Sequence, residues 1–190
     1  MCLKKNCGFS LLEVLISIVI LSLTALGAVG LQLDTLQTSR QAAYHSIAVA
    51  LANELAEEMR SNEAQMKLPD GENLFSSIKY DSRTDNNPPK SSTCYTSSAN
   101  CGPVELARAD IYEWLSNIQR SLPGGRVVVC RDAEPYSEAK ASLKWSCSSD
   151  ARSGFVIKIG WNSKKSQKET SESNEVATPH VAIPVESYVR

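Results

Sequence analysis

The sequence predicts an α+β fold in which a long amino-terminal helix packs on an antiparallel β-sheet. Two observations predict the helix: the apolar run over residues 9–33 contains a single charged residue, Glu13, and no proline or glycine occurs over residues 31–66. A third observation predicts the sheet, because four later segments are rich in β-branched and aromatic residues. These segments are residues 126–131, 141–147, 154–162 and 181–189. A chain of 190 residues is long enough for one globular core plus an extension.

The first half of the predicted helix is apolar enough to cross a membrane. A hydrocarbon core about 30 Å thick requires about 20 apolar residues in a helix, and residues 9–33 meet that length. Lys4 and Lys5 precede the run, so the positive-inside rule places them in the cytoplasm and the residues after about Leu33 across the membrane. A secretory signal peptide would end in a cleavage site after its apolar run, whereas here the helix continues.

The second half of the helix is predicted to be amphipathic. Its apolar side chains recur at helical spacing: Leu36, Ala43, Ile47, Leu51, Leu55 and Met59. A helix from residue 9 to about residue 62 would extend roughly 80 Å at about 1.5 Å per residue. The stripe from Ile47 to Met59 is the expected cover for the buried face of the sheet.

Residues 68–103 have the composition of a loop, with many Pro, Asp, Asn, Ser and Thr residues. Residues 104–122 then predict a second helix, which Pro123-Gly124-Gly125 ends. One face of this helix is apolar and carries Ala107, Ile111, Leu115, Ile118 and Leu122.

The segment at residues 154–162 shows the clearest strand pattern. Phe155, Ile157, Ile159 and Trp161 alternate with Val156, Lys158, Gly160 and Asn162. This alternation predicts a strand with one buried face. Trp114, Trp145 and Trp161 are interpreted as aromatic residues of the core or its rim.

The six cysteines form two groups, with Cys2 and Cys7 before the apolar run and four others after it. If the later part of the chain is exported, its four cysteines predict two disulfides, and three pairings are possible. The spacing favours Cys94 with Cys101 and Cys130 with Cys147. Zinc is the competing hypothesis, but these spacings differ from the short cysteine pairs of structural zinc sites.

Charge and motif content argue against several functional classes. The chain carries 20 basic and 21 acidic residues, and its net charge of -1 gives no global attraction to nucleic acid. The basic run Lys164, Lys165 and Lys168 lies in a polar segment with several glutamates, so DNA capture has weak support. The two histidines, His45 and His180, lie in no recognisable nucleophile or metal pattern, so we expect no enzymatic activity and no cofactor.

Residues 8–15, with Lys4 and Lys5 before them, resemble the class III leader junction of type IV prepilins and pseudopilins. The resemblance implies that prepilin peptidase cuts between Gly8 and Phe9 and methylates Phe9. Glu13 would then be the fifth mature residue, and its carboxylate is implied to pair with the amino terminus of a neighbouring subunit. That role would compensate a carboxylate that costs about 2–3 kcal/mol at mid-membrane. The alternative for Glu13 is a hydrated position near the cytoplasmic interface.

The same resemblance implies the type IV pilin fold and a domain organisation. Residues 1–8 form the leader, residues 9–33 the membrane-spanning half of the helix, residues 34–66 the amphipathic half, and residues 67–190 the periplasmic head. The implied location is the inner membrane, with one span and a cytoplasmic amino terminus, and later the pilus at the cell surface. The implied partners are prepilin peptidase, other minor pilins, the major pilin and the inner-membrane assembly platform.

Short patterns in the head resemble PilV-type minor pilins. They are Asp110-Ile111-Tyr112-Glu113-Trp114-Leu115, Leu122-Pro123-Gly124-Gly125 and Ile159-Gly160-Trp161. The resemblance implies a subunit that helps to start pilus assembly at or near the tip, with twitching motility, adhesion or DNA uptake as downstream roles. Two alternatives remain open: a pseudopilin of a type II secretion system, and a single-span membrane protein with a periplasmic binding domain whose amino terminus is never cut.

Overall fold

A computed structural model describes residues 10–85, 87–90, 94–96, 99–148, 152–163 and 178–185 of the chain. The chain forms two compact units, Met1–Ala42 and Ala43–Arg190. The first unit is helical from Leu11 onward, and the second contains the end of that helix and all of the strands.

The first helix, α1 (Leu11–Ser61), is continuous because no proline interrupts its backbone hydrogen bonds. In the first unit its large apolar side chains are exposed, among them Leu11, Ile16, Leu21 and Leu31. Hydroxyl groups on this surface bond back to carbonyl oxygens of the preceding turn, such as Ser17 Oγ to Glu13 O at 2.7 Å. These bonds satisfy the polar side chains of an otherwise apolar surface within the helix itself.

Asn62 ends α1 and starts the short helix α2 (Glu63–Met66). Its side-chain oxygen accepts from the Gln65 amide at 3.2 Å, and its amide nitrogen donates to Pro103 O at 2.8 Å. The predicted end of the long helix, near residue 62, is therefore confirmed, and a separate turn of helix follows.

The second unit contains a four-stranded antiparallel sheet with the order β1-β2-β5-β6. The strands are β1 (Lys79–Asp81), β2 (Arg126–Arg131), β5 (Phe155–Gly160) and β6 (Val181–Val185). The register pairs Val129 with Ile157 and Ile157 with Ile183, so large apolar side chains lie beside one another across the sheet.

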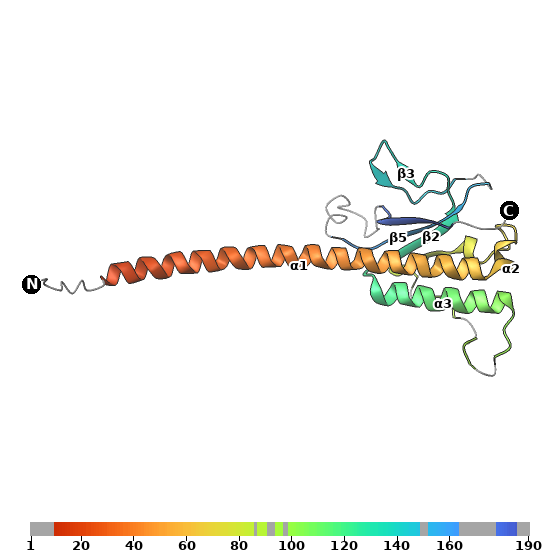
Figure 1. Cartoon of the computed structure of the whole chain (residues 1–190), viewed down its shortest axis with the longest axis horizontal. Coiled ribbons are helices and arrows are strands. Elements are labelled where there is room, and N and C mark those ends of the chain that lie inside the picture. Colours follow the sequence, from red (N-terminus) through yellow and green to blue (C-terminus); the bar gives the residue numbers. More distant parts are fainter. Residues whose placement is uncertain are drawn as a thin grey trace, which may run out of the picture. The chain divides into compact units, whose positions relative to one another are not determined.

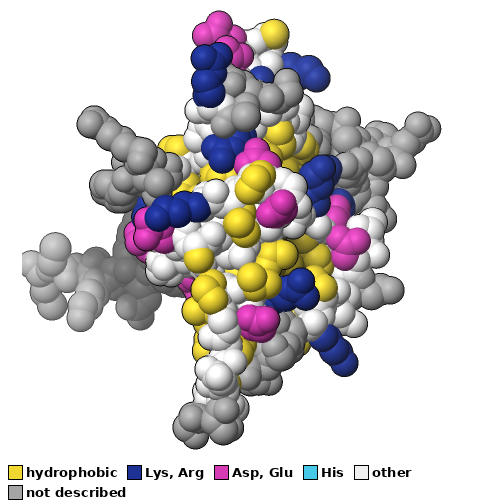
Figure 2. All heavy atoms as spheres, turned by 90° about the vertical axis from the view of Figure 1, so that its right-hand side faces the viewer, with side chains coloured by type: hydrophobic (Ala, Val, Ile, Leu, Met, Phe, Trp, Pro, Cys, Tyr) yellow, Lys and Arg dark blue, Asp and Glu magenta, His cyan; other side chains and the backbone are white. Residues whose placement is uncertain are grey.

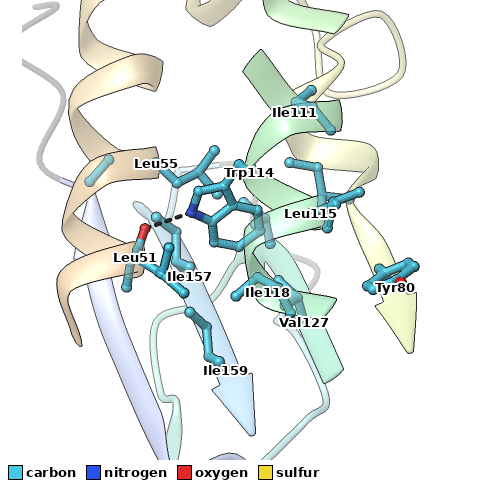
Figure 3. Packing of buried hydrophobic residues seen from close by; sticks show 14 of the residues in the cluster. Leu51, Leu55, Tyr80, Ile111, Trp114, Leu115, Ile118, Val127, Ile157 and Ile159 are labelled. Atoms are coloured by element: carbon cyan, nitrogen blue, oxygen red, sulfur yellow. Dashed lines mark hydrogen bonds between the residues drawn. The ribbon is translucent and has the colours of Figure 1, made fainter. Parts of the chain in front are cut away.

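Two helices cover one face of this sheet. Within the second unit, α3 (Pro103–Ser121) lies beside the end of α1, with strands β2 and β5 next to them (Figure 1). Trp114 projects from α3 toward α1, and its indole Nε1–H donates to the Leu51 carbonyl oxygen at 2.7 Å (Figure 3). The buried residues of α1 are Ala48, Leu51, Ala52, Leu55, Ala56 and Met59, as the amphipathic stripe predicts.

Pro103 and Gly124 mark the two ends of α3. Pro103 is the first helical residue, where its missing N–H costs no hydrogen bond. Gly124 has a positive φ of 60°, and a Cβ atom there would lie 2.5 Å from the Asn162 side chain. The predicted second helix and its glycine stop are therefore confirmed.

The opposite face of the sheet is also covered, which the alternation in β5 did not predict. All six residues of β5 are buried. A hairpin of β3 (Tyr136–Ser137) and β4 (Ser142–Leu143) lies in the segment that links β2 to β5 and forms a separate two-stranded sheet. The predicted strand at residues 141–147 is thus reduced to Ser142–Leu143 and does not join the main sheet.

A second correction concerns the segment predicted to be loop. It contains a 3-10 helix, Phe75–Ser77, and the edge strand β1. Ile78, which precedes β1, and Tyr80, within it, bring apolar surface to the core. The architecture of a long amino-terminal helix followed by an antiparallel sheet is the predicted α+β, type IV pilin-like fold. Basic, acidic and apolar side chains are interspersed on the face in Figure 2, in keeping with the net charge of -1.

Candidate functional site

Glu13 lies in the first turn of α1. A carboxylate there is favoured by the partial positive charge at the helix amino terminus. Its amide N–H donates to Ser10 O at 3.0 Å, and its carbonyl oxygen accepts from Ser17. Gly8, Phe9, Lys4 and Lys5 lie outside the described residues, so the cleavage site and the basic leader stay predictions.

Glu13 is surrounded along the chain by apolar residues whose side chains are exposed. By length and composition, α1 is the one helix in the described part of the chain that could cross a membrane. This apolar amino-terminal helix is consistent with membrane anchoring of a pilin-like protein.

Two disulfides fix segments of the second unit. Cys94 is bonded to Cys101 and Cys130 to Cys147, with Cα atoms 5.9 and 6.1 Å apart. Bonds of this kind persist in oxidising compartments, which include the bacterial periplasm. Cys2 and Cys7 lie outside the described residues.

Lys158 and Asp132 form a buried ion pair that the sequence pattern did not reveal. Lys158 Nζ donates to Asp132 Oδ2 at 2.6 Å, to Lys144 O at 2.9 Å and to Ser146 O at 2.6 Å. All three ammonium donors are thus used, and both side chains are almost fully buried. Burial alone would raise the pKa of Asp132. Hydrogen bonds from the Lys158 ammonium and the Glu134 amide, together with the positive charge of Lys158, instead lower this pKa. The sequence feature that could have predicted this ion pair is a lysine in the middle of a strongly apolar strand.

This ion pair holds the segment between β2 and β5 against the sheet. The carbonyl oxygens of Lys144 and Ser146 come from that segment, and Cys147 ties its end to β2. Arg126 also stacks over the Trp145 ring, 4.5 Å from its centre. The cluster therefore positions this chain segment, because all of its ammonium hydrogen bonds are used in holding it.

A second cluster joins α1, α3 and the Cys94–Cys101 ring. The Tyr95 hydroxyl donates to Asp110 Oδ1 at 2.5 Å. Glu58 lies near Asp110 and Glu54, and its buried Oε2 atom has no hydrogen-bond partner in the described structure. Burial, and then the charges of Asp110 and Glu54, raise the pKa of Glu58 to about 8. Glu58 is therefore largely protonated at neutral pH.

The two histidines lie far apart in the sequence, but both of their rings contact the ring of Trp161. The His180 ring stacks on Trp161 with a 4.2 Å centroid distance, and the exposed His45 contacts the same ring edge-on at 6.3 Å. His180 Nδ1 accepts from the Trp161 amide at 3.3 Å, which requires an unprotonated Nδ1. Burial, and then the charge of His45, lower the pKa of His180. In the described part of the chain, no group of three or more His, Cys, Asp or Glu side chains is arranged to hold a metal.

Comparison with protein families matches residues 3–29 to the prokaryotic N-terminal methylation motif. This stretch contains Gly8, Phe9 and Glu13 and most of the apolar half of α1. No curated protein and no solved structure gives a significant match. Proteins with this motif are structural subunits rather than enzymes. The motif indicates that the chain is a type IV pilin-like or pseudopilin substrate of prepilin peptidase, made for assembly into a pilus or secretion system.

Proposed function

We propose that this protein is a minor pilin of the PilV type, which acts with other minor pilins to start assembly of a type IV pilus. The observation that carries the proposal is the methylation motif at residues 3–29, of which residues 11–29 lie in α1. A helix that is apolar in its first half and amphipathic in its second suits a subunit that moves from a bilayer into a fibre. No cofactor takes part.

Processing begins at the leader. Prepilin peptidase cuts between Gly8 and Phe9 while Lys4 and Lys5 remain cytoplasmic, and Phe9 is methylated. The chain then spans the inner membrane once, with its head in the periplasm, until the pilus assembly platform extracts it.

Glu13 is proposed to set the position of the subunit in the fibre. Its carboxylate pairs with the amino terminus of a neighbouring subunit, a charge-assisted interaction that is strong in an apolar environment. The place of Glu13 in the first turn of α1, beside exposed apolar side chains, supports this role.

The head supports the pilus over the type II secretion alternative through its resemblance to PilV-type minor pilins. Both disulfides belong to the part of the chain that follows the membrane helix, which fits a periplasmic domain in either system. The patterns shared with PilV-type minor pilins fall on α3, its glycine stop and the end of β5. Twitching motility, adhesion and DNA uptake are the downstream roles.

Processing is tested by intact mass and amino-terminal sequencing of the protein from membranes of its native host. We expect a mature chain that begins at methylated Phe9, and a Gly8→Val variant that stays uncut. Gly27→Val is the matched control, because a Cβ at Gly27 meets no atom within 4 Å and the residue lies away from the cleavage site. A native chain that keeps residues 1–8 while the peptidase is active would support the uncut membrane-anchored binding protein.

The choice between pilus and secretion system is tested by shearing surface fibres from the same cells. We expect the mature chain in the sheared fraction and its loss when the pilus assembly ATPase is deleted. A chain that is cut but depends only on the type II secretion ATPase would contradict the pilus assignment and leave the pilin-class assignment intact.

A further inference from the structure

A cleft of about 690 Å³ lies between α3 and the segment that contains β1. One wall is a stripe on α3 formed by Val104, Arg108, Ile111 and Leu115. The opposite wall includes residues 77–80 and Leu74, and residues from 85–90 also line the cleft. In Figure 3, Leu115 and Ile111 lie on the side of α3 toward Tyr80, whereas Trp114 faces α1.

Among the residues that the structure describes, the hydroxyl of Tyr80 has no hydrogen-bond partner, although Tyr80 is 4% exposed and lines the cleft. A buried hydroxyl without a hydrogen bond costs on the order of 1–3 kcal/mol. The folded chain therefore holds a polar group that an incoming acceptor would satisfy.

The backbone of β1 offers a second point of attachment. Val129 N–H donates to Ile78 O at 3.0 Å, and Ser82 N–H donates to Gly125 O at 2.9 Å. In an antiparallel pair, alternate residues turn their backbone groups toward the partner strand. Because Ile78, Tyr80 and Ser82 face β2, the N–H and C=O of Lys79 face away from it. β1 is also an edge strand of the sheet, so another strand can pair at this point.

The charges around the cleft favour an acidic ligand. Lys79, Lys90 and Arg108 line it, and the structure shows no ion pair for any of them within the described residues. The three basic side chains outnumber the two acidic ones in the lining, of which Asp85 accepts the Asp81 amide through Oδ2 at 2.9 Å. Glu105 is the other.

We propose that this cleft binds an extended peptide segment of another pilin-like subunit, with an acidic side chain in the cleft. The segment pairs its backbone with Lys79, and its carboxylate accepts from the Tyr80 hydroxyl and is attracted by Arg108 and Lys90. The inference rests on the proposed function in one respect, since it takes the partner from the subunits that assemble with this chain.

The test uses the full-length chain in detergent and a set of synthetic 12-residue peptides. The peptides cover the periplasmic parts of the host proteins that carry the same methylation motif, and binding is measured by fluorescence anisotropy. We expect bound peptides to contain Asp or Glu within a strand-forming sequence, and alanine at that acidic position to weaken binding about 10-fold or more. N-methylation of the one backbone amide that pairs with Lys79 O should abolish binding.

Tyr80→Phe separates recognition from folding. It removes an unsatisfied buried hydroxyl, so the free energy of unfolding should stay the same or rise, whereas peptide affinity should fall about 5- to 10-fold. Arg108→Glu should weaken binding further, and Lys140→Glu, an exposed charge reversal outside the cleft lining, should leave it unchanged.

The inference is overturned if none of the peptides binds, or if Tyr80→Phe and Arg108→Glu bind as well as the unmodified chain. Its failure is distinguishable from failure of the proposed function, because cleavage at Gly8 and recovery from sheared fibres are measured without any peptide. A cut and assembled chain that binds none of the peptides refutes the cleft alone.

Discussion

At the scale of single residues, Lys158 places a charged side chain in the interior of the second unit. Its ammonium group is fully buried and bonds to one carboxylate and two carbonyl oxygens. Lys158→Met should lower the free energy of unfolding by about 3–5 kcal/mol, because it leaves the Asp132 carboxylate buried without its partner. Guanidinium denaturation followed by tryptophan fluorescence measures the change.

Lys140→Met is the control for Lys158, since Lys140 is exposed and its replacement should change stability by no more than about 0.5 kcal/mol. Replacing both partners, with Lys158→Met and Asp132→Leu, should recover part of the loss because no unpaired charge remains. Equal stability of Lys158→Met and the unmodified chain would show that the ion pair contributes nothing.

We expect Glu58 to make the free energy of unfolding depend on pH. Its pKa is raised from 4.5 to about 8, so the folded chain binds this proton more tightly than the unfolded chain. The linked stability is fully present below pH 4.5 and is lost as the pH rises through about 8. Glu58→Gln, which mimics the protonated form, should therefore match the unmodified chain at acid pH and exceed its stability above pH 8.

Thermal unfolding from pH 4 to pH 9 measures this dependence. Glu57→Gln is the matched control, one residue along α1, because the Glu57 side chain is 73% exposed and pairs with Arg60 at the surface. A Glu58→Gln variant with the same pH profile as the unmodified chain would rule out Glu58 as the source of the dependence.

At the scale of elements, the two disulfides constrain loops of different length. Their cysteines are 17 residues apart for Cys130–Cys147 and 7 apart for Cys94–Cys101. Loop-closure entropy predicts losses of about 3 and about 2 kcal/mol when each pair is changed to serine. The loss at Cys130–Cys147 should be the larger also because this bond holds the segment that covers β5 and supplies oxygens to Lys158.

Denaturation of the two double-serine variants compares the two losses, and hydrogen exchange locates them. Amides of β5 should lose protection without Cys130–Cys147 and keep it without Cys94–Cys101. A larger loss of stability for the Cys94–Cys101 variant would contradict this expectation. It would mean that the bond closing a surface ring contributes more than the bond that holds the segment over β5.

At the scale of the whole molecule, the proposed role of Glu13 separates processing from assembly. Glu13→Ala should still be cut at Gly8, because the cleavage site is unchanged, but its recovery in sheared fibres should fall at least about 10-fold, since no carboxylate meets the neighbouring amino terminus. Immunoblots of membrane and sheared fractions measure both steps.

Asp34→Ala is the control for Glu13, because it removes another exposed carboxylate from α1 in the first unit. It should be processed and assembled as the unmodified chain is. Normal fibre recovery of Glu13→Ala would contradict the registry role and return Glu13 to the alternative of a hydrated interfacial residue.

The sequence by itself determined the features that depend on local periodicity. The apolar run and the apolar stripe that follows it specified α1, the spaced apolar face and glycine stop specified α3, and β-branched residues specified β2, β5 and β6. The motif at residues 3–29 is equally local, since it needs only consecutive residues. Features of this kind can be predicted from sequence because the periodicity of apolar residues depends only on the local backbone geometry of consecutive residues.

Only the tertiary structure decided which surfaces are covered and which polar groups meet. β1 has three residues, too few for a period-two pattern. It forms because Ile78 and Tyr80 pack into the core and the strand pairs with β2. Lys158 alternates like a solvent-facing residue, yet Asp132 and two carbonyl oxygens from the segment between β2 and β5 bury it. Glu58, Asp110 and Tyr95, like the two histidines at Trp161, come from distant parts of the chain. Burial and pairing depend on the neighbours that folding supplies, and no short stretch of sequence contains them.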